Sequence, residues 1–169
     1  MTNIILRPVN TVSHEARAAC MNLAYADYHI PLQVDADGLA RMDYLYDVDP
    51  DASIVAERDG ALIGQALLSR RGERSWISAV GTVPAARRQG VARAMMQALI
   101  VNARRGGLAE VILEVIDENA RAHTLYRDLG FADVRELLTW RLAADADPLP
   151  IPQELLSEVA PESVIPHFD

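Results

Sequence analysis

The sequence predicts an α/β fold, a mixed sheet with helices on its faces. Short β-patterned runs are interleaved along the chain with longer runs whose apolar residues recur at helical spacing. This interleaving is typical of helices packed on a sheet. The chain has 169 residues, of which 50% are apolar and 24% are charged. Its length and composition therefore predict a globular domain with a sizeable core.

The first half of the chain is expected to contain four strands and two helices. A short strand covers residues 4–9, and a helix begins near Ser13. A second short helix is expected near residues 37–47, and three strands follow it. The pair Asp59-Gly60 between the first two of these strands predicts a hairpin turn.

The second half is expected to alternate helices with strands. A helix that begins after Pro84 ends at the basic and glycine-rich letters "RRGG". A buried strand is expected over residues 110–116, a helix over 119–130 and a long strand over 131–143. The remaining residues predict an extended arm with one short helix.

Charge separates a domain over residues 1–142 from an acidic, proline-rich arm over 143–169. The arm contains five of the nine prolines, six of the 24 acidic residues and none of the 16 basic ones, so the net charge of −8 falls to −2 for the domain. Nucleic acid is therefore not an expected partner. No apolar run is long enough to span a bilayer and the first residues do not form a signal peptide. We expect no membrane partner and a cytoplasmic protein.

Metal chemistry is not expected from the cysteine and histidine content. Cys20 is the single cysteine, which excludes an intramolecular disulfide and a cysteine-based metal cage. It lies on an apolar helical stripe, which favours a packed thiol over a nucleophile. The four histidines have no ligand spacing, and the chain has no lysine for Schiff-base chemistry.

The stretch "VPAARRQGVARAM", residues 83–95, combines features that disfavour a plain helix start. Gly90 costs about 1 kcal/mol relative to alanine in a helix. Arg87 and Arg88 place positive charge where the helix dipole disfavours it. Free N–H groups at a helix start bind anions, so a bound phosphate would make all three residues favourable. The alternative is an ordinary helix start with surface arginines.

The same stretch resembles the acyl-CoA signature of the GCN5-related N-acetyltransferases (GNAT), in which a valine and a proline precede Arg/Gln-x-x-Gly-x-Gly/Ala. Arg87, Gly90 and Ala92 fill the second part, and Thr82 replaces a usual valine. Downstream, "LEVIDENARAHTLYRDLGF", residues 113–131, resembles the second family block, most closely that of ribosomal-protein N-terminal (alanine) acetyltransferases. The resemblance covers the domain in element order and residues 80–131 in sequence detail.

This resemblance implies a GNAT fold, with a mixed, mostly antiparallel sheet of six or seven strands and helices on both faces. It also implies acetyl-CoA as co-substrate, no metal, and direct transfer of the acetyl group to a primary amine. The strand edge at 80–82 would pair with pantetheine, and Asn119 would cap its helix and bind pantetheine. The backbone of the signature would cradle the pyrophosphate. The implied cofactor-binding residues are Val80, Gly81, Thr82, Arg87, Arg88, Gln89, Gly90, Val91, Ala92, Arg93, Asn119 and Tyr126.

Two residues are expected to carry the chemistry. Tyr126 would face the sulfur of CoA and stabilise the departing thiolate as a donor; the alternative is a core aromatic. Glu114 would be the general base, and the alternative is a glutamate at a sheet edge. Trp76 stands where histone-type members carry a catalytic glutamate, so that subclass is not expected. Weaker candidates for the base are Asp117, Tyr28, His29 and His123.

The acceptor is expected to be a small-molecule or peptide amine. Tyrosine and aspartate are frequent between residues 25 and 47, which suggests an acidic, aromatic mouth for a cationic amine; a solvated face is the alternative. The candidate acceptor-binding residues are Tyr28, His29 and Tyr44.

Two further expectations concern the whole chain. A non-catalytic acyl-CoA-binding domain, or one half of a tandem protein, is the alternative to an enzyme, and the presence of both Tyr126 and Glu114 favours the enzyme. The arm keeps apolar residues, so we expect it to cover a sheet edge of its own domain or of a second copy, which would give a homodimer. A plain linker is the alternative.

Overall fold

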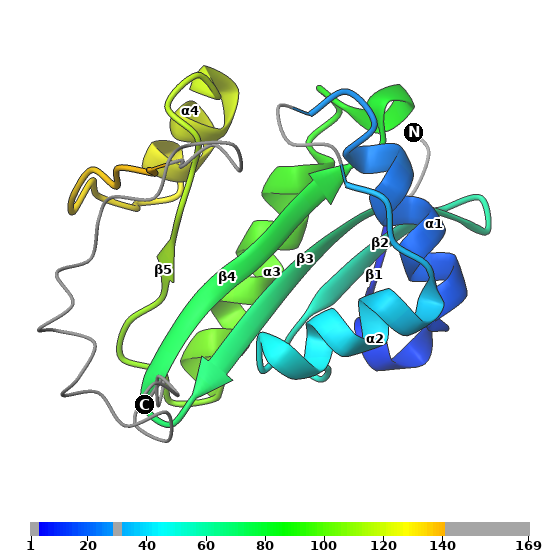
Figure 1. The fold of residues 1–169 in the computed structure, drawn as a ribbon, viewed down its shortest axis with the longest axis horizontal. Helices are drawn as coiled ribbons and strands as arrows, with labels where there is room; N and C mark the ends of the chain where they lie inside the picture. The colour runs from blue at the N-terminus through cyan, green and yellow to red at the C-terminus, as the bar shows by residue number, and fades with distance from the viewer. Residues whose placement is uncertain (1–3, 29–31, 141–169) are drawn as a thin grey trace, which may run out of the picture. The chain divides into compact units, whose positions relative to one another are not determined.

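The computed structural model describes residues 4–28 and 32–140 (Figure 1). The chain divides into two units, residues 1–132 and 133–169. All helices and strands of the described residues lie in the first unit. The described residues of the second unit, 133–140, form neither helix nor strand.

A five-stranded mixed sheet forms the centre of the first unit, with its strands in chain order. The first four strands pair antiparallel, and β5 pairs parallel with β4. Tight turns with a left-handed glycine connect β2 to β3 and β3 to β4, as the hairpin prediction required. The strands are β1 (Ile5–Pro8), β2 (Ile54–Arg58), β3 (Ala61–Arg71), β4 (Arg74–Thr82) and β5 (Ile112–Leu113).

Four α-helices and two short 3₁₀ turns complete the described part of this unit. Three of the α-helices begin at a side-chain cap, in which Ser13, Asp35 or Asn119 accepts a hydrogen bond from a backbone N–H three residues later. The helical elements are η1 (Val9–Thr11), α1 (His14–Ala24), α2 (Ala36–Leu45), η2 (Pro84–Ala86), α3 (Val91–Arg105) and α4 (Ala120–Asp128).

Helices cover both faces of the sheet, as predicted. α1 and α2 lie on one face and α3 lies on the other (Figure 1). β3 is buried continuously over residues 63–69, because it contributes to the core on both faces. Cys20 is buried in α1, and burial raises the pKa of its thiol to about 11, which confirms a packed thiol. No helix of the described residues is long and apolar enough to cross a membrane.

The fold class is therefore confirmed, but six or seven strands are not: the described residues form five. The strand expected over 110–116 contracts to Ile112–Leu113. The long strand expected over 131–143 is wrong for residues 131–140. A β-pattern becomes a strand only when a neighbour supplies ladder hydrogen bonds, and β5 itself makes only two pairs. The arm over 143–169 lies outside the described residues.

A buried ion pair ties α1 to α2. The Arg17 side chain is 3% exposed, and its guanidinium makes a two-bond contact with Asp43, at 2.6 Å and 3.1 Å. His14 contacts the same carboxylate at 3.2 Å from a half-exposed position. Because the arginine is sealed from water, Asp43 is the group that makes its charge tolerable.

We expect Asp43→Ala to lower the free energy of unfolding by about 3–5 kcal/mol, because it leaves the buried Arg17 charge unpaired. Urea denaturation followed by circular dichroism measures this. His14→Ala removes the solvent-accessible partner of the same carboxylate and should cost less than about 1 kcal/mol. Equal, small losses in the two variants would contradict the assignment.

Candidate active site

β4 loses its neighbouring strand halfway along its length. It pairs with β5 at only two positions, the last of them at Ile77, although β4 continues to Thr82. A β-bulge marks the same place, because Ser78 stands opposite no residue of β3. Bulges are common beside active sites, where they redirect a strand. Beyond the bulge, one edge of β4 has no partner strand among the described residues.

This edge of β4 presents hydrogen-bond donors. The N–H of Val83 donates to a carbonyl of β3 at 3.0 Å, so the alternation of backbone groups turns those of Val80 and Thr82 away from β3. The Tyr25 hydroxyl donates to the Val80 carbonyl at 3.3 Å. The Nε of Arg87 donates to the Thr82 carbonyl at 3.1 Å. Because both carbonyls are occupied, the two outward N–H groups are what the edge offers to a ligand.

Tyr25 packs directly on the backbone of β4. A Cβ added at Gly81 would stand 2.9 Å from the Tyr25 ring and 3.0 Å from the Ala24 methyl group, so only glycine fits there. The ring also meets Tyr28 edge to face, with 5.2 Å between centroids. Tyr25 was grouped only with the acceptor mouth in the sequence analysis. The sequence signal for its true position was a glycine inside a strand, which marks close approach.

Tyr126 lies on α4 and joins this group of tyrosines. Its ring packs edge to face on Phe131, at 6.0 Å between centroids, and lies against the α3 side of the core. Burial, with smaller contributions from Tyr25 and Tyr28, raises the pKa of Tyr126 to about 12. Burial also raises the pKa of Tyr25 to about 12. The fold thus places Tyr25, at the end of α1, and Tyr126, on α4, near enough to interact electrostatically, and burial favours the protonated form of both hydroxyls.

The loop between β4 and α3 presents a run of unpaired backbone N–H groups. The amide of Ala86 donates to the Val83 carbonyl, that of Arg87 to the Pro84 carbonyl, and that of Ala94 to the Gly90 carbonyl. Between them, the N–H groups of residues 88–93 meet no backbone acceptor within the described residues. Arg88 and Gly90 have left-handed backbones, with φ of 65° and 80°. Alternation of this kind turns successive N–H groups into a concave anion site.

Two arginines of the signature, Arg87 and Arg93, form ion pairs with acidic residues outside the loop. Both terminal nitrogens of Arg87 contact the Asp27 carboxylate at 2.7 Å, and one also donates to the Ala24 carbonyl at 3.0 Å. The guanidinium lowers the pKa of the Asp27 carboxyl. Arg93 contacts Asp128 at 2.6 Å. These arginines hold the loop against α1 and α4, so the amides and the other nearby cations remain for an anion.

The remaining cations beside the loop are Arg58 and Arg88. The guanidinium of Arg58 donates to the Gln89 side-chain carbonyl at 2.6 Å, and Gln89 in turn donates to the Ala85 carbonyl at 2.9 Å. Arg88 forms no ion pair with any residue that the structure describes. Arg58 was not among the predicted site residues, because nothing in the local sequence connects it to the signature.

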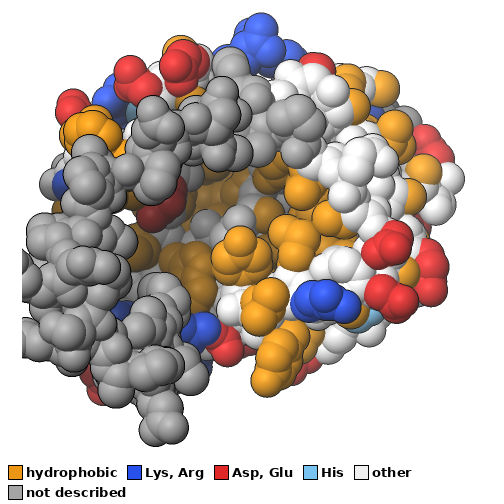
Figure 2. All heavy atoms as spheres, viewed as in Figure 1, with side chains coloured by type: hydrophobic (Ala, Val, Ile, Leu, Met, Phe, Trp, Pro, Cys, Tyr) orange, Lys and Arg blue, Asp and Glu red, His pale blue; other side chains and the backbone are white. Residues whose placement is uncertain are grey.

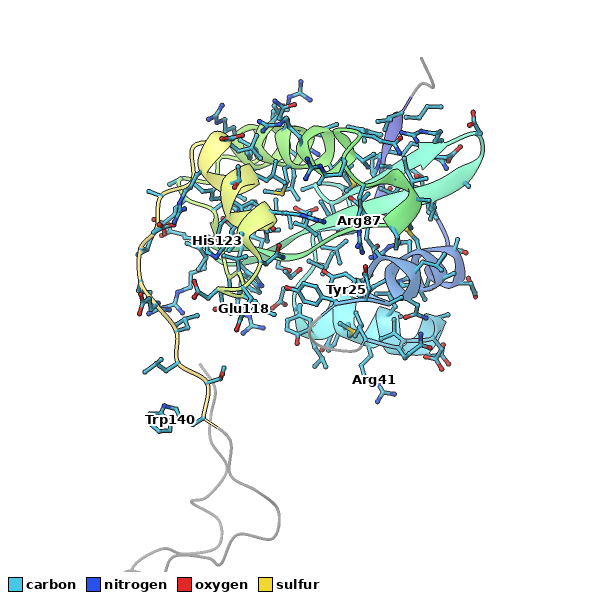
Figure 3. The ribbon with its side chains drawn as sticks, turned by 90° about the horizontal axis from the view of Figure 1, so that it is seen from above. Tyr25, Arg41, Arg87, Glu118, His123 and Trp140 are labelled. Carbon is cyan, nitrogen blue, oxygen red and sulfur yellow. The ribbon has the colours of Figure 1, made fainter. Side chains whose placement is uncertain are left out.

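The second family block places its residues less closely around this edge. Asn119 caps α4 by accepting a hydrogen bond from the Ala122 N–H at 3.2 Å. Glu114 follows β5 in an exposed position. His123 lies on α4, and its Nε2 is buried without a hydrogen-bond partner in the described part of the chain. Figure 3 shows Tyr25 and Arg87 beside α1 and β4, with His123 and Glu118 across from them near the start of α4.

The predicted acceptor residues are only partly brought together. Tyr28 contacts Tyr25, whereas Tyr44 is 82% exposed on α2, and His29 lies outside the described residues. Figure 2 shows hydrophobic side chains on the floor of a hollow beside β4. A cavity of about 100 Å³ opens between α1, α2 and the bulge of β4. Its lining includes Met21, Met42, Asp43, Tyr46 and Ser78.

A larger cavity, of about 260 Å³, lies at the opposite end of β4. It is lined by the β3–β4 hairpin and the residues around β5, and includes Trp76. Neither the donor edge nor the amide run contributes to it, so it is not part of this site. Within the described residues, no group of three or more histidine, cysteine or acidic side chains is placed to hold a metal ion.

Comparisons with known proteins bear on the family and the fold. The sequence model of the acetyltransferase (GNAT) family matches residues 18–131. No curated protein matches the chain at a significant level. Among solved structures, an aminoglycoside N-acetyltransferase, AAC(6')-Iy, in complex with CoA has a TM-score of 0.65 at 17% identity, over 84% of this chain and 96% of its own.

Two further solved structures show the same fold. A ribosomal-protein-alanine N-acetyltransferase from Escherichia coli has a TM-score of 0.64 at 19% identity, over 79% of this chain and 80% of its own. A putative acetyltransferase from Salmonella typhimurium with acetyl-CoA has a TM-score of 0.63 at 24% identity, over 76% and 79%. The family match covers more than half of the sequence and includes both blocks that the sequence analysis singled out. The chain belongs to the GNAT acetyltransferase family.

Proposed function

We propose that the protein transfers an acetyl group from acetyl-CoA directly to a primary amine. The observation that carries this proposal is the continuity of two donor surfaces, the outward N–H groups of Val80 and Thr82 and the amide run of residues 88–93. The first suits the carbonyl groups of a thioester and of pantetheine. The second suits a diphosphate. Both belong to one segment of chain, as a long ligand with these groups requires.

The amide run would bind the diphosphate of CoA. Hydrogen bonds to a charged group contribute about 1.5–3 kcal/mol each, so three or four of the available N–H groups give substantial affinity. The dipole of α3 adds to this attraction. The backbone of residues 88–93 would thus serve the role that the sequence predicts for it. The side chains of Arg87 and Arg93 act differently, because they fix the loop through Asp27 and Asp128.

The edge of β4 would hold the reacting end. An N–H of Val80 or Thr82 directed at the thioester carbonyl would stabilise the negative charge that develops on its oxygen. The hydroxyl of Thr82 is buried and has no partner among the described residues, which fits a polar ligand lying against it. Threonine in place of the usual valine therefore adds a hydrogen-bonding group at this edge.

Tyr126 would stabilise the departing thiolate as a hydrogen-bond donor. Its pKa is raised to about 12 by burial. A thiol has a pKa near 8.5, so full proton transfer from this tyrosine would be uphill by about 5 kcal/mol. The hydroxyl therefore keeps its proton, and the proton that finally reaches the sulfur must come from the amine by another route.

A base must free the amine, since deprotonating it at pH 7 costs about 4–5 kcal/mol. We propose Glu114 for this role, receiving the proton through water because its carboxylate is exposed. His123 is the second candidate. Its buried, unpartnered Nε2 is the specific observation that favours it.

The acceptor would place an apolar part in the cavity beside the β4 bulge. Two methionines line this cavity, and methionine adapts to irregular apolar groups. The Asp43 carboxylate in its wall is already paired with Arg17, so it is a weak anchor for a cation. This favours an amine attached to an apolar body, in a small molecule or a peptide, over a polycation.

We expect Gly90→Val to weaken CoA binding at least tenfold, because a β-branched residue cannot hold the φ of 80° that aims the amides. Isothermal titration calorimetry with CoA measures this. Gly72→Val is the matched control: it introduces the same backbone strain, at φ of 60°, in the distant β3–β4 turn. Unchanged affinity in a folded Gly90→Val variant would contradict the placement of the diphosphate.

We expect Tyr126→Phe to lower kcat by about 10²-fold, as loss of one charge-stabilising donor does, with CoA affinity changed less than twofold. Free-thiol release with a panel of amines measures the rate. The raised pKa keeps the hydroxyl protonated at all working pH values, so no loss of rate below pH 10 should trace to Tyr126.

Equal rates of thiol release in the wild type and Tyr126→Phe would mean that Tyr126 is only a packed core aromatic. Tight CoA binding without thiol release on any amine would indicate the non-catalytic acyl-CoA-binding domain.

A further inference from the structure

We propose that Arg58 binds the 3′-phosphate of CoA and makes the protein prefer CoA to its 3′-dephospho form. The inference rests on the proposed function, and it adds the residue that would recognise the nucleotide end of the co-substrate. Arg58 is the last residue of β2, thirty-one positions before the loop residue that it contacts.

The charge balance around the loop requires such a group. A phosphate monoester carries about −1.5 to −2 charges at neutral pH, in addition to those of the diphosphate. The amide run supplies neutral donors. The charges of Arg87 and Arg93 are balanced by Asp27 and Asp128. A monoester beside the loop therefore needs a cation that is not already neutralised.

Arg58 and Arg88 both meet this condition, and Arg58 is the one whose guanidinium a side-chain hydrogen bond holds at the loop. Its neighbour Glu57 is in an ion pair with Arg7 on β1. Arg58 itself forms no ion pair with any carboxylate among residues 4–28 and 32–140. A guanidinium has five N–H donors. The hydrogen bond to Gln89 uses one of them, and Nε is buried without a partner in the described residues.

Gln89 fixes the guanidinium at the loop. Its side chain is held at both ends, by the Arg58 donor at 2.6 Å and by its own bond to the Ala85 carbonyl at 2.9 Å. The backbone N–H of Gln89 belongs to the amide run. Since the 3′-phosphate and the diphosphate of CoA are attached to the same ribose, a cation one side chain away from the diphosphate site is within reach of the 3′-phosphate.

The test is calorimetric binding of CoA and 3′-dephospho-CoA to the full chain. The wild type should bind CoA about tenfold more tightly than 3′-dephospho-CoA, which corresponds to a difference of about 1.4 kcal/mol in binding free energy. Arg58→Gln should bind the two ligands equally, with its affinity for 3′-dephospho-CoA unchanged. Arg58→Lys keeps the charge and should retain part of the preference. Arg105→Gln removes an exposed arginine at the other end of α3 and should behave as wild type.

Three results would overturn the inference while leaving the proposed function intact. The wild type could bind both ligands equally, a comparison that needs no variant. Arg58→Gln could weaken both ligands by the same factor, which would place Arg58 at the diphosphate or in support of the loop. Arg58→Gln could also keep the full preference. Failure of the proposed function looks different, because the wild type would then bind neither ligand or release no thiol from acetyl-CoA.

Discussion

The separation of β4 from β5 beyond Ile77 is the constraint on which the site depends. A free strand edge carries donors and acceptors in alternation, and unpaired groups that are partly buried cost free energy. Tyr25 and Arg87 satisfy the outward carbonyls of Val80 and Thr82 from side chains. The edge therefore favours a ligand that brings acceptors. A further β-strand, which would bring both donors and acceptors, fits this edge less well.

Arg87 connects the two donor surfaces, which are the edge of β4 and the amide run of residues 88–93. One guanidinium contacts Asp27 and the Ala24 carbonyl at the end of α1, while its Nε holds the Thr82 carbonyl at the end of β4. The end of α1 also carries Tyr25, which packs on β4 at Gly81. The amide run begins at the next residue after Arg87. The β4 edge and the amide run of residues 88–93 therefore share one support, which would fix the spacing between the reacting end and the diphosphate end of the proposed ligand.

Local sequence patterns predicted the parts of the site that local geometry determines. The glycine and the free N–H groups of the loop and the Asn119 cap follow from residues near each other in the chain. The partners of the arginines do not, because Asp27 lies sixty residues before Arg87 and Gln89 lies thirty-one after Arg58. Pairing of side chains at such separations is decided by how the elements pack. The expected strand is absent over residues 131–140 for a related reason, since its pattern could not specify a neighbour.

Near neutral pH the two buried tyrosines can act only as hydrogen-bond donors, so a base for the amine must be another group. A tyrosine could serve as base only when ionised, and burial raises the pKa of both Tyr25 and Tyr126 to about 12. Near neutral pH, each is therefore fixed as a donor, and donors stabilise charge on sulfur or oxygen without accepting a proton. The acceptor's proton must leave toward a group with a lower pKa. Carboxylates and imidazoles are such groups. Glu114 follows β5 and His123 lies on α4, so with either as the base the amine's proton would leave toward β5 and α4, the side opposite α1.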